Sequence, residues 1–225
     1  MNQVVIDNRK KIAAAVTSCF QTLDSYHKAV EEFGAEKKRI ASMPYIQAEQ
    51  ERLVNQAADK LRNAADGHCE QIQRELGTIR TAAEEMQNLM DIGEDLQNAL
   101  SVVKSLGKAL PPEVRIKLVE QFKGQYQALT MLKAAYEAVE IPSEPYFKGM
   151  IFDAPRMVKE LEGKAACLAD KPGENTMVAF SFGNDLEKFA QSLGVELTTR
   201  YRDAVDTSAA MSRQLRAVMG LSTGD

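Results

Sequence analysis

The sequence contains no tryptophan, and aromatic residues of all kinds make up only 6% of its 225 residues. So few large rings are unusual in a compact globule. They are typical of helical rods, in which alanine, leucine, isoleucine and valine fill the contacts. Proline is also scarce, with 7 residues, and none occurs between Tyr45 and Leu106. Because proline interrupts helices, its absence allows one helix over this whole stretch.

Strong charge of one sign is also lacking. The net charge is −4, and residues 1–110 and 111–225 each carry 14 basic and 16 acidic side chains. This balance does not favour a nucleic acid as partner, because no basic field is available to attract one. Hydrophobic residues (44%) and charged residues (27%) are in the proportions of a folded chain, and no apolar run approaches the ~18–20 residues of a membrane span.

Motifs for catalysis or metal binding are missing as well. The sequence contains no GxxxxGK[ST], GxGxxG or GxSxG pattern and only two histidines. Asp24 and His27 would share one helical face, as the ligands of a di-iron bundle do. The second such pair is absent, because Ala65 stands three residues before His68. We therefore expect no enzymatic activity, no metal and no cofactor.

Cysteine is rare, and the number and spacing of the cysteines do not indicate a disulfide framework. Cys19, Cys69 and Cys167 are odd in number and far apart, which predicts a reducing, cytoplasmic compartment. One alternative is export with Cys19 as a lipobox cysteine, since basic residues and a short apolar run precede it. That run, residues 12–16, is shorter than the about 7–15 residues of a signal peptide, so export is not favoured.

The sequence does contain a sustained repeat of apolar residues at steps of three and four. Such a repeat places one apolar seam along each helix and is typical of helices that wind around each other. It predicts an all-α protein, an elongated antiparallel coiled coil or long helical bundle with a smaller helical C-terminal part. The predicted core seam contains Leu23, Val30, Phe33, Ile72, Leu76, Ile79, Met86, Leu96, Leu100, Val103, Phe122, Leu129, Leu132, Leu197, Tyr201 and Leu215.

Residues 1–140 are predicted to form a rod of three helices, at about 3–41, 45–106 and 112–140. Pro44 predicts a chain reversal after the first helix, with a strong kink as the less favoured alternative, and Pro111 and Pro112 mark the start of the third helix. Gly93 is the weakest position of the second helix, because it falls in the seam at a change of phase. A break at Gly93 therefore remains an open alternative.

Residues 141–225 are predicted to form a proline-punctuated connector followed by C-terminal helices. Asp153 is a candidate N-cap for a helix over residues 154–170. Residues 177–182 alternate like a strand without a partner, which indicates an extended loop or the start of a helix. A short helix is expected over residues 185–193. A last seamed helix, over residues 196–219, packs either on the rod or on another subunit.

Three groups of charged residues are candidates for interaction. The first is a basic group at the end of the first helix, the second an acidic run in the second helix, and the third a set of arginines in the last helix. A helix C-terminus complemented by cations and a solvated acidic face are the structural alternatives. The arginines either pair with the acidic run or bind a partner. The groups are Lys37, Lys38 and Arg39; Glu84, Glu85, Asp91, Glu94 and Asp95; and Arg200, Arg202, Arg213 and Arg216.

These features favour a non-enzymatic structural or assembly protein that acts through coiled-coil contacts and forms a homo-oligomer. One alternative is a membrane-surface scaffold, similar to BAR domains in its three long helices, or a protein that inserts its connector at Ile151 and Phe152. The lack of an extended basic stripe makes a membrane the less favoured partner. A second alternative is an adaptor or inhibitor that binds one partner protein.

Overall fold

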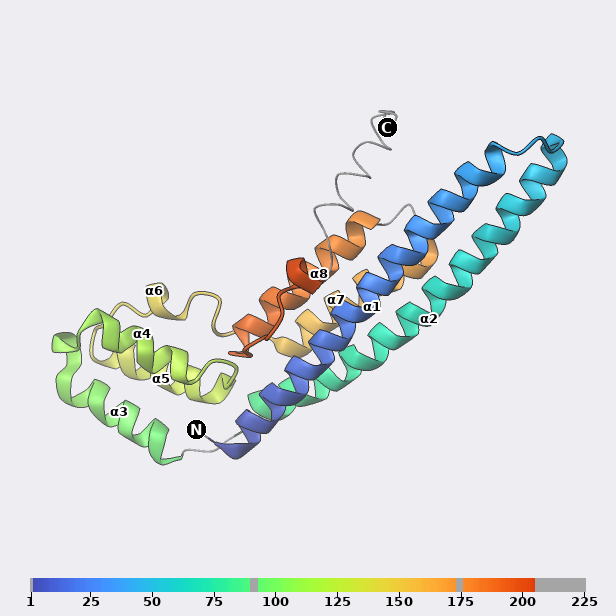
Figure 1. Cartoon of the computed structure of the whole chain (residues 1–225). Coiled ribbons are helices and arrows are strands. Elements are labelled where there is room, and N and C mark those ends of the chain that lie inside the picture. The colour runs from blue at the N-terminus through green and yellow to red at the C-terminus, as the bar shows by residue number, and fades with distance from the viewer. Residues whose placement is uncertain (1, 90–92, 173–175, 205–225) are drawn as a thin grey trace. The chain divides into compact units, whose positions relative to one another are not determined.

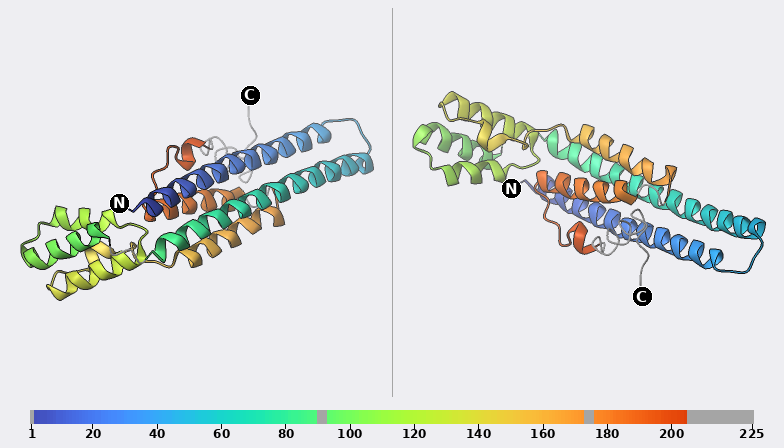
Figure 2. Two further views of the ribbon diagram at one scale, coloured as in Figure 1. Left: turned by 90° about the horizontal axis from the view of Figure 1, so that it is seen from below. Right: turned by 90° about the horizontal axis from the view of Figure 1, so that it is seen from above.

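The computed structural model describes residues 2–89, 93–172 and 176–204 (Figure 1). Over these ranges the protein is all-α and contains no strand. Two long helices, α1 (Gln3–Ala41) and α2 (Gln47–Gln87), pack closely in antiparallel orientation, and shorter helices follow (Figure 2). The shorter elements are α3 (Glu94–Leu106), η1 (Gly107–Ala109), α4 (Pro112–Gln121), α5 (Tyr126–Ala138), α6 (Glu144–Phe147), α7 (Ala154–Asp170), α8 (Thr176–Ser192) and α9 (Tyr201–Ala204).

Helix α1 follows the predicted heptad repeat, since the residues of its predicted seam are buried. Six of them have no exposed surface: Val5, Ile12, Val16, Cys19, Leu23 and Tyr26. After Ala41 the chain reverses, and the Gln50 side chain donates a hydrogen bond to the carbonyl of Met43 across the turn. The predicted helix over residues 3–41 and the reversal at Pro44 are confirmed. Over the described ranges, no helix combines the length and apolar character that a membrane span requires.

Arg9 is a polar residue within this apolar repeat. Its guanidinium donates hydrogen bonds to two backbone carbonyls, from Nε to Leu193 (3.1 Å) and from Nη2 to Lys123 (2.7 Å). The backbone of Gly194 has φ +71°, and a Cβ at this position would lie 2.6 Å from Arg9 Nη2. The guanidinium therefore joins three distant parts of the chain at a point where a side chain on residue 194 would displace it.

The prediction of one continuous helix over residues 45–106 is wrong, and the alternative of a break at Gly93 is confirmed. Helix α2 ends at Gln87, and α3 begins at Glu94 after Gly93, whose backbone is extended (φ −62°, ψ 168°). Glu94 and Asp95 occupy the first turn of α3, where carboxylates interact favourably with the helix dipole. Met86 and Leu96 are both buried, so predicted seam residues are part of the core on both sides of the break.

The prediction of one helix over residues 112–140 is also wrong, because α4 and α5 are separated at residues 122–125. Gly124 has φ +80°, a conformation that L side chains rarely adopt. A Cβ at Gly124 would also meet Met86 Cε at 2.7 Å and the Leu193 carbonyl oxygen at 2.8 Å. The turn therefore requires glycine both for its backbone conformation and for the close approach of its neighbours.

The predictions for the C-terminal third had mixed outcomes. Helix α7 has the predicted bounds, and Asp153 Oδ1 accepts a hydrogen bond from the Arg156 N–H, as expected of an N-cap. Residues 177–182 form the start of α8, which also contains most of the predicted helix over 185–193. The predicted helix over 196–219 does not begin at Glu196, because α9 starts at Tyr201. The remainder of that prediction, from residue 205, lies outside the described residues.

The chain divides into two compact units, and each contains part of both long helices. The first comprises Met1–Val16, Leu76–Glu160 and Lys188–Leu197; the second comprises Thr17–Glu75, Leu161–Glu187 and the described part of Thr198–Asp225. In the second unit, α7 lies along α2, where Gln73 Nε2 donates a hydrogen bond to the Glu162 carbonyl (3.0 Å). Helix α8 lies along α1, where the rings of His27 and Phe180 stack with centroids 4.6 Å apart.

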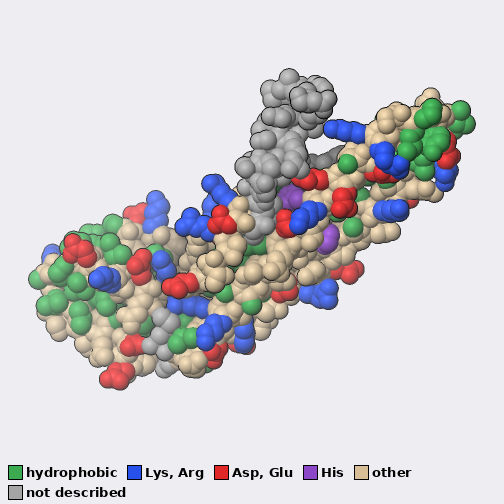
Figure 3. All heavy atoms as spheres, in the orientation of Figure 1, with side chains coloured by type: hydrophobic (Ala, Val, Ile, Leu, Met, Phe, Trp, Pro, Cys, Tyr) green, Lys and Arg blue, Asp and Glu red, His purple; other side chains and the backbone are tan. Residues whose placement is uncertain are grey.

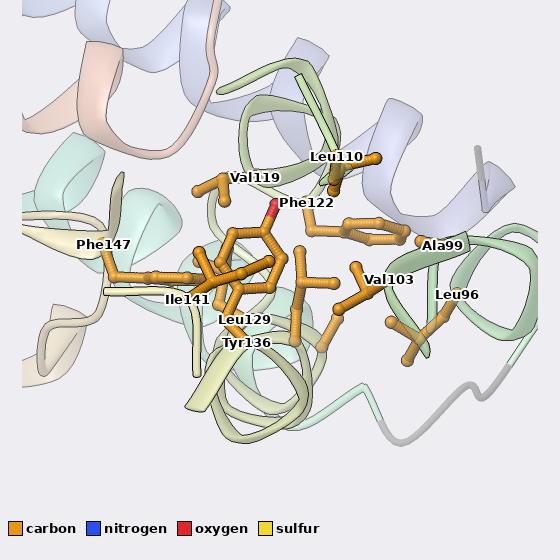
Figure 4. Close-up of a cluster of buried hydrophobic side chains, with 12 residues drawn as sticks. Leu96, Ala99, Val103, Leu110, Val119, Phe122, Leu129, Tyr136, Ile141 and Phe147 are labelled. Atoms are coloured by element: carbon orange, nitrogen blue, oxygen red, sulfur yellow. The ribbon is translucent and has the colours of Figure 1, made fainter. Parts of the chain in front are cut away.

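Within the first unit, α3–α6 enclose a hydrophobic cluster around Tyr136 (Figure 4). The Tyr136 ring packs edge-on against Phe147, with centroids 5.3 Å apart, and its hydroxyl donates a hydrogen bond to the Arg115 carbonyl (3.0 Å). Leu129, Leu132 and Val103 have no exposed surface. The apolar residues that the repeat assigned to two long helices thus form the core of a bundle of short ones.

Candidate functional site

The basic residues at the end of α1 lie in the helix's final turns and in solvent. Lys37, Lys38 and Arg39 are all exposed, and the Arg39 guanidinium makes a bidentate contact with the Glu36 carboxylate (2.5 and 2.6 Å). Lys38 and Arg39 occupy the last turn, where cations complement the helix dipole. These contacts favour the structural interpretation of Arg39.

The acidic run is divided between two helices. Glu84 and Glu85 lie near the end of α2, and Lys11 Nζ lies 3.9 Å from a carboxylate oxygen of Glu85. Glu94 and Asp95 lie exposed in the first turn of α3. Asp91 falls outside the described residues. The run is therefore not one continuous face of one helix.

Arg200 and Arg202 are exposed at the start of α9, in the second unit. Arg213 and Arg216 lie outside the described residues.

Most residues of the predicted core seam are buried in the structure. Leu197, Val30, Phe33 and Leu100 are partly buried, Leu215 is not described, and the other predicted seam residues are buried.

An apolar groove, which we call the hairpin groove, lies between α1 and α2 in the second unit and was not predicted from the sequence. Its floor is formed by Ala29, Phe33, Leu53, Ala57, Leu61 and Ala64, and its rim by Glu32, Glu36, Gln56 and Lys60; its volume is about 310 Å³. Spacings of three and four residues on both helices place these side chains on one face. That spacing was visible in the sequence, but it runs beside the main seam and was not counted as a second stripe.

The hairpin groove faces away from α7 and α8. On α1, Ala29 and Glu36 lie about 180–200° around the helix from His27, which contacts α8. On α2, Ala57 and Ala64 lie about 160–180° from Gln73, which contacts α7. Both helices therefore offer this groove on the side of the pair that none of the described shorter helices of the second unit covers.

The end of the hairpin is apolar as well. Hydrophobic side chains gather where α1 turns into α2 (Figure 3). In the turn, Tyr45 is 48% exposed and Ile46 is 77% exposed, the largest value among the described large hydrophobic residues. By contrast, Ile151 and Phe152, which the sequence suggested for membrane insertion, are only partly exposed, and the Phe152 ring packs against Phe189.

His27 lies in an aromatic cluster on the other side of α1. It is 4% exposed, its ring stacks on Phe180, and its Nε2 lies 3.4 Å from the Tyr201 hydroxyl. Among the described residues, no group hydrogen-bonds to its Nδ1. Burial lowers the pKa of His27 to about 4, opposed by the negative charge of Asp24. The imidazole is therefore neutral near pH 7 and acts as a flat core residue.

The structure does not combine Asp24 and His27 into a metal site. Asp24 instead pairs with Lys28, with its Oδ2 2.7 Å from the ammonium nitrogen. In the part of the chain that the structure describes, no three histidine, cysteine or acidic side chains are placed to hold a metal ion together. The three cysteines form no disulfide, and burial raises the pKa of the Cys19 thiol in the middle of α1.

Tyr201 anchors the chain to the second unit close to residue 204, the last residue that the structure describes. Its ring lies 5.3 Å from that of Phe20, and its backbone N–H donates a hydrogen bond to the Glu187 carboxylate (3.0 Å). The ring also rests on Gly183 of α8, where an added Cβ would lie 2.4 Å from the ring atom Cζ. Glycine at position 183 thus creates the space that Tyr201 fills.

Replacing Gly183 tests this packing. Gly183→Ala should lower the free energy of unfolding by about 1–3 kcal/mol, because the new methyl group overlaps the Tyr201 ring. Gly163→Ala in α7 is the matched control, since nothing lies within 4 Å of its Cβ position, and it should stabilise by about 0.5–1 kcal/mol. Urea titration of both variants measures the difference. Equal stabilisation by the two substitutions would show that Tyr201 does not occupy this space.

Comparison of the chain with protein-family models, with curated proteins and with solved structures finds no match. The class of protein is therefore defined by the fold alone, an all-α bundle built on two long antiparallel helices.

Proposed function

We propose that this protein is a non-enzymatic structural or assembly component that associates with further copies of itself through helix–helix contacts. The observation that carries the proposal is the hairpin groove, an apolar face on a two-helix segment that none of the described shorter helices of the second unit covers. Two helices alone cannot enclose their apolar side chains, because each needs neighbours on more than one side. Val30, Phe33, Leu53 and Val54 are accordingly only partly buried.

The dimensions of the groove suit another helical hairpin. Its α2 side extends from Leu53 to Ala64, which corresponds to about 16 Å at about 1.5 Å per residue, or three helical turns. Ala29, Ala57 and Ala64 are small, so a second pair of helices can approach to the usual distance of about 8–10 Å. Two hairpins stacked in this way form a four-helix bundle and cover both grooves.

The rim favours a second copy of this chain over an unrelated apolar helix. The α1 rim carries the acidic residues Glu32 and Glu36, and the α2 rim carries Lys60. In a two-fold symmetric pair whose hairpins point in the same direction, with the symmetry axis along the helices, the α1 rim of one copy faces the α2 rim of the other. Glu32 and Glu36 then lie opposite Lys60 of the second copy, and opposite charges meet on both sides of the contact.

A charge placed on the groove floor tests the proposal. We expect Ala57→Glu to weaken self-association at least about tenfold, equivalent to about 1.4 kcal/mol, because it adds bulk and a carboxylate to a face that dimerisation buries. Sedimentation equilibrium measures this as a return to the monomer mass of 24.9 kDa. Asn63→Glu is the control, since Asn63 is exposed on α2 and absent from the groove lining.

A wild-type chain that remains monomeric up to its solubility limit would contradict the proposal. The competing membrane function rests on the apolar turn, where Ile46 is 77% exposed, and on the nearby Lys37 and Lys38. Sedimentation with anionic vesicles distinguishes the two functions. Salt-sensitive binding to vesicles by a monomeric chain would favour the membrane function, since anionic lipids attract clustered lysine and arginine.

A further inference from the structure

We propose that Tyr201 is a pH-sensitive latch, which holds the short helix α9 on the second unit near neutral pH and releases it in acid when His27 takes up a proton. The proposal does not depend on self-association, because the groups involved lie within one unit of one chain. Three features support it: a single buried anchor, a histidine that this anchor shields from water, and a buried imidazole nitrogen without a hydrogen-bond partner.

Tyr201 is the only buried anchor of α9 that the structure describes. From Glu196 to Asp203 the other side chains are exposed or partly exposed, whereas Tyr201 has no exposed surface. Its ring rests on Gly183, and its backbone N–H donates a hydrogen bond to the Glu187 carboxylate. A helix of four residues has little stability of its own, so loss of this anchor releases α9 while α1 and α8 stay folded.

The same tyrosine shields His27 from water. Its hydroxyl oxygen lies 3.4 Å from His27 Nε2, and the ring of Phe180 stacks on the imidazole, which leaves His27 only 4% exposed. Release of Tyr201 opens the Nε2 edge of the imidazole to solvent, whereas Phe180 still covers one face. Water can therefore solvate a charged His27 only after the latch opens.

The hydrogen bonds of the attached state suit a neutral imidazole. The Tyr201 hydroxyl donates to the Ala179 carbonyl (3.3 Å), so its oxygen is available to accept the N–H of His27 Nε2. Among the described residues, Nδ1 of His27 has no hydrogen-bond partner. Protonation adds an N–H at Nδ1, and in the attached state this buried donor of a charged ring meets no acceptor. A proton on His27 therefore opposes attachment of Tyr201.

The charges around His27 do not compensate for its burial. Asp24, on the same helix, is the only described charge that acts appreciably on His27, and it pairs with Lys28. None of the described charged groups on α2, α7, α8 or α9 does so, including Glu187, which binds the Tyr201 backbone. Burial outweighs Asp24 and lowers the pKa of His27 to about 4, compared with about 6.5 for a solvated imidazole. The released state thus binds the proton more tightly, and release becomes more favourable as the pH falls below about 6.5.

Hydrogen exchange of the Tyr201 amide, followed by NMR, measures the open fraction of the latch. After correction for the pH dependence of the intrinsic exchange rate, its protection should fall about 10- to 25-fold between pH 7.5 and pH 5.0. The Tyr201 amide should also exchange faster than the Leu23 amide of α1 at each pH, because release does not require unfolding of the unit. Protection of Tyr201 that does not depend on pH, or that equals the protection of Leu23, would overturn the proposal.

Two variants separate His27 from the other acid-sensitive group at the latch, the Glu187 carboxylate. His27→Phe keeps a ring against Phe180 but binds no proton, so the protection of the Tyr201 amide should change less than about twofold over the same pH range. Glu187→Gln keeps an oxygen that can accept the Tyr201 N–H and removes the carboxylate, so the fall in protection should persist. Retention of the pH dependence in His27→Phe, or its loss in Glu187→Gln, would overturn the proposal.

Discussion

Leu76→Asp should destabilise the protein by about 5 kcal/mol or more and abolish most of its helical signal at 25 °C. Leu76 is 0% exposed in the C-terminal half of α2, so the substitution removes a buried leucine and places a carboxylate out of contact with water. The total stability of a domain is about 5–15 kcal/mol, and a cost of this size leaves little of it. Far-UV circular dichroism during urea and thermal unfolding measures the effect.

The control for Leu76→Asp is Gln71→Asp in the same helix. Gln71 is exposed, so this substitution has a similar cost in helix propensity without burying a charge. Its effect should stay below about 1 kcal/mol. If the two variants melt within a few degrees of each other, Leu76 is not part of the packed face between α1 and α2.

Acidification should destabilise the protein through His27, by about 2–3 kcal/mol between pH 7 and pH 4. The pKa of His27 is about 4 in the folded chain and about 6.5 in an unfolded one. As the pH falls through this window, the unfolded chain binds a proton that the folded chain excludes, so the equilibrium shifts toward unfolding. Asp24 favours the charged imidazole, but its effect is smaller than that of burial.

The pH dependence of His27→Phe isolates this contribution. A phenyl ring can still stack on Phe180, and it does not titrate, so the variant should lose about 2–3 kcal/mol less than the wild type over the same range. His68→Gln is the matched control. The His68 side chain is partly exposed, and its partial burial lowers its pKa. Identical pH profiles for the wild type and His27→Phe would show that His27 is not buried in neutral form.

Much of the helical content could be predicted because local pattern and packing agree. Helix α1 and helix α7 have the predicted bounds, since a heptad repeat, a proline at the turn and an Asp153 cap all act within a few residues of the element they define. Burial of Leu23, Ile72 and Leu76 follows from the same repeat. These features depend on neighbours along the chain, which a sequence displays directly.

The pattern marked Gly93 as a possible break in the second predicted helix, but it gave no sign of the break at residues 122–125 in the third. Around Gly93 and Gly124, apolar residues on both sides remain buried, so the repeat continues while the helix axis does not. What enforces the turn at Gly124 is the proximity of Met86 and Leu193, which are distant in sequence. Contacts of this kind are a property of the folded arrangement, and no local propensity reports them.

The candidate site was predicted less well than the fold. The residues predicted for interaction were groups of charged side chains. In the structure, however, Arg39 pairs with its neighbour Glu36, and the acidic run is divided by the break after α2. The floor of the hairpin groove consists mostly of alanine and leucine, which any helix contains. The groove becomes a candidate only when the structure shows that α7 and α8 pack on the other side of the pair of long helices.

The bonds of Arg9 have a consequence for the order in which the chain matures during translation. These two acceptors lie 114 and 184 residues further along, so the guanidinium cannot reach both until residue 193 has left the ribosome. Until then the apolar side chains of the first turns of α1, including Val5 and Ile12, lack part of their final contacts. In that state they can bind chaperones or aggregate. The first turns of α1 are thus among the last of the described parts to reach their final environment.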